Sequence, residues 1–255
     1  MFKIEDFDIK LDTEILGRNF VYCEEADSSN TVLLTDPQFD KEGTLLLVEN
    51  QTKGKGRQGR VWDTVPEQNL TFSVLLKDTF INEYSNLISL AVGVAVAQSI
   101  ENLYQLKVDL KWPNDILING KKVCGILCES VSQSNKISKI VIGIGINVNQ
   151  VTFPTKYNII PTSIKKESKK TAVRERLLSE VLNNLEEILD ILSINPKQVL
   201  EDWRSRCKMI GEKVKVVDKE KETYGIFEDI NNEGHLLLKV NDKIEKISFG
   251  DVSLR

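Results

Sequence analysis

Residues 44–62 read TLLLVENQTKGKGRQGRVW and fall into two parts of opposite character. Residues 44–48 form a continuous apolar run, which is typical of a buried β-strand. The stretch from Lys53 to Arg60 interleaves glycines with lysines and arginines and contains no carboxylate. Glycine lets a backbone approach oxygen atoms closely, and lysine and arginine donate to phosphate. We therefore predict a buried strand that leads into an anion-binding loop, although a solvated charged turn explains this composition equally well.

The segments on both sides of this loop predict a sheet with helices packed on it. Strands are expected over residues 19–23, 44–48, 70–76, 122–129 and 139–149, and over residues 108–118 with an interruption at residues 111–115. Helices are expected over residues 86–106, 171–192 and 196–206, and after the capping sequence Asp27-Ser28-Ser29-Asn30. The pair Asn119-Gly120 predicts a type I′ hairpin turn. A mixed, mainly antiparallel sheet flanked by helices makes the predicted fold class α+β.

From residue 210 the pattern changes to short β segments separated by polar turns. Strands are expected here over residues 213–217, 223–228, 235–240 and 244–249. Their close spacing predicts a small β-barrel or sandwich. A unit of about 45 residues has only a marginal core of its own, so it should lean on the larger part of the chain. We therefore divide the chain into a large domain, residues 1–209, and a small β domain, residues 210–255.

The overall composition is that of an ordinary globular protein. Of 255 residues, 41% are hydrophobic, and 34 Lys and Arg against 38 Asp and Glu leave a net charge of −4. This balance implies no general attraction to nucleic acid or to an acidic membrane. There is no basic and apolar leader and no apolar run of 18 residues, so we expect a soluble, cytoplasmic protein.

Cysteine and histidine usage argues against a zinc site. The four cysteines form no C-x-x-C pair, and the single histidine, His235, cannot complete a zinc site with them at the usual spacings. We expect the cysteines to be reduced and mostly buried thiols. They are Cys23, Cys124, Cys128 and Cys207.

Two familiar nucleotide-binding motifs are excluded by single positions. Gly54 and Gly59 have P-loop spacing, but residues 60–61 are Arg and Val where the motif needs Lys and then Ser or Thr. The sequence GIG at residues 143–145 resembles the start of a dinucleotide fingerprint, but Val148 stands where the third glycine should be. A nucleotide that binds this protein must be held in another way.

Five segments together resemble the biotin protein ligases. They are DSSN (27–30), GKGRQGR (54–60), KWPND (111–115), KVCGIL (122–127) and GIGINVN (143–149). Each segment is weak evidence alone, but the five occur in the order and spacing of that family, and KWPND is the most specific. The resemblance covers nearly the whole chain. It implies a class II synthetase-like catalytic domain of the biotin and lipoate ligase type, followed by a small SH3-like β-barrel.

The resemblance also implies an activity. Such an enzyme joins biotin and ATP into biotinoyl-5′-AMP, releases pyrophosphate, and passes biotin to a lysine of a biotin carboxyl carrier protein or carboxylase domain. Biotin and ATP are the implied substrates, and Mg²⁺ is expected with the nucleotide, with Asp115 as a candidate neighbour. The segment before the predicted core is too short for the three helices of a DNA-binding helix-turn-helix domain, so DNA binding is not expected. Relatives are monomers or homodimers, and no membrane partner is expected.

By position, the resemblance assigns Lys122 to the bond-forming centre and Arg57 to the loop that covers it. The implied biotin contacts are Ser28, Ser29, Asn30, Gln51, Lys55, Gly56, Arg57, Lys122 and Gly125. The implied ATP and phosphate contacts are Gly54, Arg57, Arg60, Trp62, Lys111, Asn114, Asp115 and Asn147. These residue types suit the task, because a ureido ring needs donors and acceptors in an apolar pocket. Fixed cations must also offset the repulsion between a carboxylate and the α-phosphate that it attacks.

Simpler explanations stay open for several of these residues. Trp62 and Trp112 can be core aromatics, Lys122 a solvated hairpin residue, and Asn147 a structural residue at a strand end. The chain also departs from the common family pattern at four positions, which concerns local geometry and affinity. Lys55 and Gln58 stand where arginine is common, Ser29 where threonine is common and Cys124 where alanine is common.

Two other functions are alternatives to a biotin ligase. Lipoate protein ligases share the fold and the chemistry but usually carry an Arg-Arg-x-Ser-Gly-Gly-Gly motif, which this sequence lacks. A nucleic-acid-binding module could use the basic glycine loop, but it would need a broad basic face with stacking aromatics. The chain is acidic overall and contains 7% aromatic residues, which favours the ligase.

Overall fold

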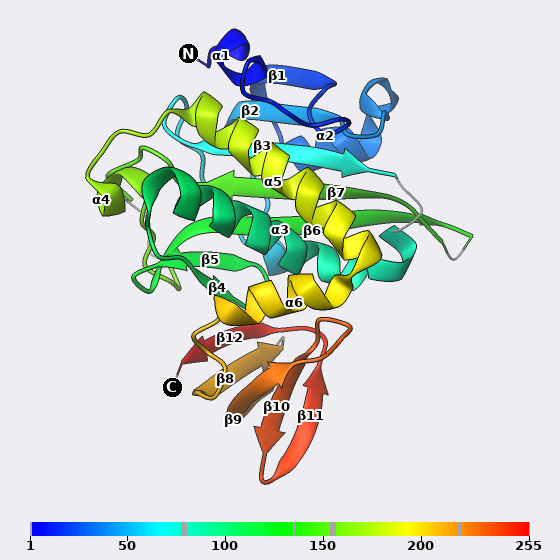
Figure 1. Cartoon of the computed structure of the whole chain (residues 1–255), viewed down its shortest axis with the longest axis vertical. Coiled ribbons are helices and arrows are strands. Elements are labelled where there is room, and N and C mark those ends of the chain that lie inside the picture. Colours follow the sequence, from blue (N-terminus) through cyan, green and yellow to red (C-terminus); the bar gives the residue numbers. More distant parts are fainter. Residues whose placement is uncertain (1, 78–80, 135, 154–156, 219–220, 255) are drawn as a thin grey trace.

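The computed structural model describes residues 2–77, 81–134, 136–153, 157–218 and 221–254 (Figure 1). In this part of the chain, seven strands form one sheet in the order β1-β2-β3-β7-β6-β5-β4. The β1–β2 pair is parallel and every other neighbouring pair is antiparallel. The predicted mixed α+β class is therefore confirmed. The strands are β1 (Phe20–Ala26), β2 (Leu45–Gln51), β3 (Leu70–Leu76), β4 (Asp109–Lys111), β5 (Asp115–Ile118), β6 (Lys121–Gln133) and β7 (Lys136–Ile146).

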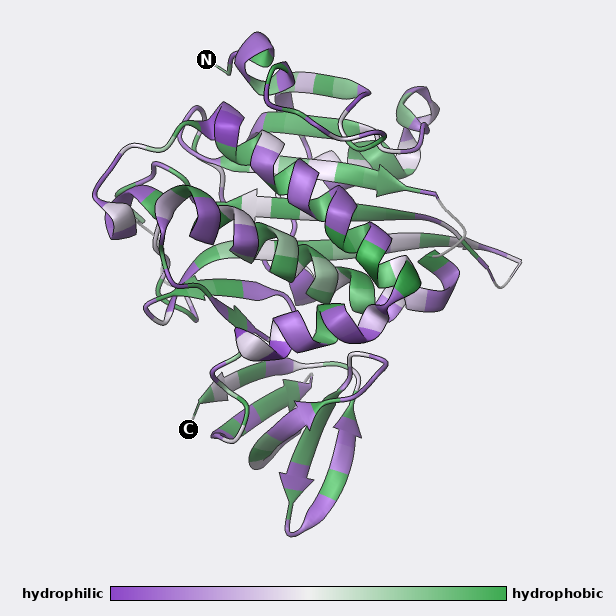
Figure 2. Cartoon of the chain, in the orientation of Figure 1, coloured by the Kyte–Doolittle hydropathy of each residue, from purple (hydrophilic) through white to green (hydrophobic). Residues whose placement is uncertain are grey.

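The long helices cover one face of this sheet, as Figure 1 shows. Helix α3 contacts strands β4 to β7 and packs against α5 and α6. These helices and the inward side chains of the sheet form the main apolar core. In Figure 2 the outward side of α5 is hydrophilic, which fits a helix with one buried face. The bounds of the three helices are Ile81–Tyr104 for α3, Arg174–Ile194 for α5 and Pro196–Ser205 for α6.

Helix α2 (Ser29–Thr35) packs on the opposite face of the sheet, where it contacts β2, β3, β6 and β7. A second, smaller apolar cluster lies there and includes Leu33 of the helix with Leu75 of β3 and Val141 of β7. Because side chains alternate between the two faces of a strand, every second residue of β3 and β7 points to this side. The part of this face that α2 leaves uncovered is where a ligand can reach the sheet.

The start of α2 was predicted correctly, but its capping was not. Ser28 is the N-cap residue, yet its side chain accepts no capping hydrogen bond among the described residues. The remaining short helical segments were not predicted. They are α1 (Ile4–Asp8), the 3₁₀ turns η1 (Pro37–Phe39) and η2 (Arg57–Gly59), and α4 (Ile164–Ser168).

The segment over residues 108–118, predicted as strand interrupted at residues 111–115, forms two strands. The chain reverses within the KWPND segment, so that β4 and β5 run antiparallel and Asp109 pairs with Leu117. The Trp112–Pro113 peptide bond in this reversal is cis. The next turn was predicted correctly, since Asn119 and Gly120 have φ angles of 52° and 73°, as a type I′ turn requires.

The C-terminal residues form a second, antiparallel sheet of five strands within the described part of the chain, in the order β11-β10-β9-β8-β12. It leans on the large domain as expected. The Nε1 of Trp112 donates to the carbonyl oxygen of Gly234 at 3.0 Å, and Arg204 pairs with Asp229 at 2.7 Å. The predicted division after residue 209 falls between α6 and β8 and stays a prediction. The strands are β8 (Lys213–Asp218), β9 (Lys221–Ile230), β10 (Leu236–Val240), β11 (Lys243–Ile247) and β12 (Asp251–Leu254).

The most apolar helix and the four cysteines were the subject of two predictions from composition. Among the described residues, α3 is the one helix long and apolar enough to cross a membrane, but 67% of its most apolar window is buried, so it is mostly core. Cys124 and Cys207 are buried, whereas Cys23 and Cys128 are half-buried, and all four are free thiols. Burial raises the pKa of the Cys128 thiol to about 12, which keeps the thiol protonated.

Candidate functional site

A cavity of about 560 Å³ lies on the face of the sheet that α2 covers in part, beneath the basic, glycine-rich loop of residues 53–60. Of the residues predicted to contact biotin or ATP, all but Gly54 and Lys111 line it. Gly54 lines a neighbouring cavity of about 880 Å³ on the other side of the loop. Lys111 reaches the site through Asp115, at 3.5 Å. The predicted residues in the lining are Ser28, Ser29, Asn30, Gln51, Lys55, Gly56, Arg57, Arg60, Trp62, Asn114, Asp115, Lys122, Gly125 and Asn147.

One end of the cavity is formed by neutral donors and acceptors. The backbone N–H of Ser29 donates to Gln51 Oε1 at 2.7 Å, which holds the end of β2 against the start of α2. Asn30 is 3% exposed and donates through Nδ2 to the carbonyl oxygen of Leu127. Gly143 of β7 allows this approach, because a Cβ there would lie 2.3 Å from Asn30 Oδ1. Buried amides and hydroxyls in an apolar surrounding can recognise a neutral polar ring.

The indole of Trp62 lies across β6 and β7 at two glycines. A Cβ at Gly145 would lie 2.2 Å from the indole, and a Cβ at Gly125 would lie 3.0 Å from it. The space that was expected at Gly125 for a ligand ring is therefore bordered by Trp62. Lys122 Nζ lies 5.6 Å from the centre of the Trp62 ring, within the range of a cation–π contact.

The other end of the cavity holds a buried carboxylate between two lysines. Asp115 Oδ1 lies 2.6 Å from Lys122 Nζ, and Asp115 Oδ2 lies 3.5 Å from Lys111 Nζ. Burial alone would raise the pKa of Asp115, but the charges of Lys122 and Lys111 outweigh burial and hold this pKa below its ordinary value. Burial lowers the pKa of Lys111. The cluster keeps more positive than negative charge at this end of the cavity.

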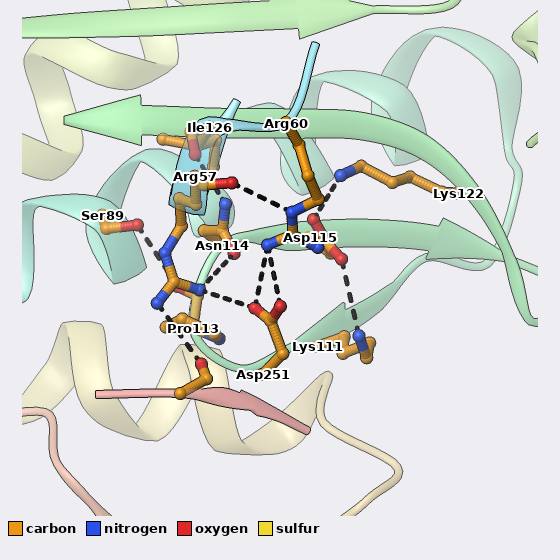
Figure 3. A network of polar contacts seen from close by, with 11 residues as sticks. Arg57, Arg60, Ser89, Lys111, Pro113, Asn114, Asp115, Lys122, Ile126 and Asp251 are labelled. Carbon is orange, nitrogen blue, oxygen red and sulfur yellow. Dashed lines mark hydrogen bonds and ion pairs between the residues drawn. The ribbon is translucent and has the colours of Figure 1, made fainter. Parts of the chain in front are cut away.

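Arg57 and Arg60 of the loop meet at one carboxylate, that of Asp251, as Figure 3 shows. Arg57 Nη1 lies 3.1 Å from Asn114 Oδ1 and 3.2 Å from Asp251 Oδ1, and Arg57 Nη2 donates to Gly250 O at 3.3 Å. Arg60 Nη2 lies 2.8 Å from Asp251 Oδ2. Burial lowers the pKa of the Arg57 guanidinium, whose side chain is only 13% exposed. The loop is thus tied both to the KWPND segment and to β12.

Asp251 and the segment before Pro161 belong to the site but were not predicted from the sequence. Asp251 lies on a strand that was not predicted, 194 residues from Arg57, and no local pattern marked it. Phe153 and Pro161 line the cavity, and the N–H of Lys122 donates to Ile160 O at 2.9 Å. Asn147 is compatible with both interpretations, a nucleotide contact and a structural residue at the end of a strand. It lines the cavity, and its backbone forms hydrogen bonds with Val123 and Ile164.

Comparison with known proteins relates this site to a family. The model of the Biotin/lipoate A/B protein ligase family matches residues 22–147, and that of the Biotin protein ligase C terminal domain matches residues 209–255. The bifunctional ligase/repressor BirA of Bacillus subtilis is 32% identical over 258 residues, which cover 99% of this chain and 79% of that protein. The chain belongs to the biotin protein ligase family.

Other relatives place this ligase in the same family. A biotin acetyl-CoA-carboxylase ligase of Mycobacterium tuberculosis is 35% identical over 220 residues, 84% of this chain and 79% of that protein. The Aquifex aeolicus biotin protein ligase in complex with biotin and ATP matches with a TM-score of 0.81 and 32% identity. That match covers 93% of this ligase and 99% of the Aquifex chain. Both parts of the chain therefore have the fold of the solved Aquifex ligase, as predicted.

The described residues offer no group of three or more His, Cys, Asp or Glu side chains that could hold a metal ion. Asp115 and Asp63 are the acidic side chains in the lining of the cavity as described, and both oxygens of Asp115 face lysines. Mg²⁺ usually binds through one or two carboxylates together with substrate phosphates. The residues present therefore fit an ion that arrives with a triphosphate rather than an ion held by a protein cage.

Proposed function

We propose that this ligase activates biotin with ATP and then transfers it to a lysine of a biotin carboxyl carrier protein or carboxylase domain. The observation that carries the proposal is that one cavity joins two unlike ends. Ser29, Asn30 and Gln51 form an end of neutral hydrogen-bonding groups, and Lys122 with Arg57 belong to a cationic end. A molecule with a ureido ring and a carboxylate tail spans such a cavity with its tail at the cations.

In the first step the biotin carboxylate oxygen attacks the α-phosphorus of ATP, and the bond to the β-phosphate oxygen breaks to release pyrophosphate. Negative charges must approach each other, so cations fixed in a buried site lower the barrier. Lys122 and Lys111, held at Asp115, are positioned for this, and Arg57 and Arg60 add charge from the loop. Mg²⁺, when bound with the triphosphate, would supply further charge neutralisation.

In the second step the amine of the acceptor lysine attacks the acyl carbon, AMP leaves, and the amine loses a proton. The mixed anhydride must be shielded from water until the acceptor arrives. The loop that carries Arg57 lies over the cavity and supports that role. The acceptor as a carboxylase component, the cytoplasm as location, and a monomer or a homodimer as the assembly stay predictions.

Biotin-dependent exchange of radiolabelled pyrophosphate into ATP tests the proposal. Exchange that requires biotin and does not occur with lipoate is expected. Exchange with lipoate alone would make the protein a lipoate ligase. Salt-sensitive binding of nucleic acid without any exchange would instead favour the binding module.

A further inference from the structure

Glu167 of α4 lies outside the cavity lining but joins two segments that flank Lys122. Its side chain is 9% exposed, and its carboxylate accepts from Thr162 Oγ1 at 2.5 Å and from Asn119 Nδ2 at 2.8 Å. Burial would raise the pKa of Glu167, but the hydrogen bonds outweigh burial and hold this pKa below its ordinary value. Lys121 Nζ also lies 3.4 Å from the carboxylate, but this lysine is 43% exposed, and an exposed ion pair stabilises little. Glu167 therefore ties the segment before α4 to the hairpin turn mainly through two hydrogen bonds.

The main chain of Lys122 lies between the segment before α4 and strand β5. Its N–H donates to Ile160 O at 2.9 Å, and its carbonyl oxygen accepts from the N–H of Thr162 at 2.8 Å. On its other side Lys122 is paired with Leu117 of β5, and the ladder between β5 and β6 shifts register next to this pair. A register shift disrupts a ladder locally. The contacts to residues 160–162 are therefore needed to fix this end of β6.

Helix α4 gives the Glu167 carboxylate a fixed position. Ile164, in the first turn of the helix, is completely buried, and its N–H donates to Asn147 O at 3.0 Å. The N–H of the next residue donates to Val148 O at 2.9 Å. These bonds attach the helix to the chain that leaves β7. A side chain on an element held in this way places its partners more precisely than one on a loop.

We propose that Glu167 is a positioning residue that fixes Lys122 Nζ at the reacting carboxylate and phosphate. The inference rests on the proposed function, in which Lys122 stabilises the charge that develops during adenylation. Glu167 acts through Lys122, because it holds both the turn before this lysine and the segment beside it against one helix. Misplacement of a catalytic group by about 1 Å can slow a reaction by about 10²-fold, so a tether outside the cavity can control the rate.

Glu167→Ala and Glu167→Gln test the tether. In Glu167→Ala the maximal rate of biotin-dependent exchange should fall by about tenfold, while KM for biotin should change by less than about threefold, because the neutral end of the cavity is unaltered. In Glu167→Gln the amide oxygen can accept from Thr162, and Asn119 can reverse its amide and accept from the new N–H. The Gln variant should therefore keep a maximal rate within about threefold of the parental rate.

The same substitution in Lys122→Ala shows whether Glu167 acts through Lys122. When the ammonium group is absent, a displaced hairpin has no cation to misplace. Glu167→Ala should then lower the residual exchange rate by less than about twofold. Asn119→Gly deletes one hydrogen bond to Glu167 but suits the φ angle of 52° at this position. It should lower the maximal rate by about threefold in the parent and by less than about twofold in Lys122→Ala.

Glu186→Ala is the matched control. The Glu186 carboxylate also holds a neighbouring segment against a helix, because it accepts from the N–H groups of Glu14, Ile15 and Leu16. Glu186 belongs to α5 and lies outside the cavity lining. Loss of this carboxylate should lower the melting temperature but keep the parental exchange rate. All exchange rates are measured well below the melting temperature of each variant, so that only folded proteins are compared.

The outcomes separate the two proposals. A parent protein without biotin-dependent exchange contradicts the proposed function itself. If the parent catalyses exchange, a parental maximal rate in Glu167→Ala refutes only the positioning role. An equal loss from Glu167→Ala with and without Lys122 also refutes it, because Glu167 would then act by another route. Should Glu167→Ala fail to fold, Asn119→Gly takes its place, and a parental maximal rate in that variant would refute the inference.

Discussion

Replacement of Lys122 probes two consequences of one charge. Its Nζ lies 2.6 Å from Asp115 Oδ1, at the end of the cavity where the carboxylate and the α-phosphate are proposed to react. In Lys122→Ala this charge is lost, and biotin-dependent exchange should slow by about 10²–10³-fold, the usual effect of removing one group that stabilises developing charge. Asp115 would keep Lys111 alone as its cationic partner, at 3.5 Å.

The same substitution should also destabilise the fold. Removal of one partner from a fully buried ion pair costs about 3–5 kcal/mol. Because the Lys122 side chain is 24% exposed and Lys111 remains, we expect about 1–3 kcal/mol, or a melting temperature lower by roughly 2–12 °C. In the parent the pKa of Asp115 is lowered, so its stabilising contribution is present above the unfolded pKa and is lost as pH falls through the folded pKa. Without Lys122, burial raises this pKa relative to the parent, so the stability deficit should shrink as the pH falls.

Calorimetry and pyrophosphate exchange on Lys122→Ala, Asp115→Asn and the double variant separate the two effects. The double variant should recover part of the stability, because no carboxylate is left without Lys122, although Lys111 loses Asp115 in its turn, and it should not recover exchange. Lys121→Ala is the control, since Lys121 Nζ lies 3.4 Å from Glu167 and outside the cavity lining. Parental exchange in Lys122→Ala, or exchange in the double variant well above that of either single variant, would refute the catalytic assignment.

Other substitutions test the loop and the C-terminal sheet. Arg57→Gly removes the contacts of Arg57 to Asp251 and Asn114, so the adenylate should dissociate at least about tenfold faster and label lysines of a bystander protein; parental dissociation and labelling would contradict this. Residues 53–65 should be cut more slowly by protease when the adenylate is bound, and equal cleavage in both states would show that the loop does not order over it. Trp112→Phe deletes the donor to Gly234 O and should lower the melting temperature by roughly 2–6 °C in calorimetry, whereas an unchanged value would show that this contact adds no stability.

Local patterns predicted much of the fold because they reflect local physics. The strand predicted over residues 70–76 coincides with β3, and the Asn119-Gly120 turn has the expected positive φ angles. Both depend on alternation or on a backbone region that nearby residues determine. The reversal inside KWPND was missed, because strand character on both sides of a short polar insertion is compatible with one strand or with two.

The site was predicted by the resemblance rather than by local patterns. The residues that this prediction missed have a physical reason in common. Fourteen predicted contacts line one cavity, but Ser73 and Asp251 had no signal in the sequence. Ser73 is one of two polar residues in the apolar strand β3, and its hydroxyl contacts Asn30, 43 residues away. Asp251 acts on Arg57 across the boundary between the two sheets. Long-range polar contacts of this kind leave no periodicity along the chain.

The segments that form the cationic end of the cavity also hold the C-terminal sheet in place. Trp112 of the KWPND segment bonds Gly234, and Arg57 of the loop bonds Asp251. A phosphate that recruits the Arg57 guanidinium must compete with the Asp251 carboxylate, because both are anions at one donor group. If nucleotide binding weakens this ion pair, the contact between the two parts of the chain loses the same free energy, because coupling between two sites is reciprocal. Domain contact and nucleotide affinity are therefore coupled through Arg57, and a substitution at either side of the pair should change both.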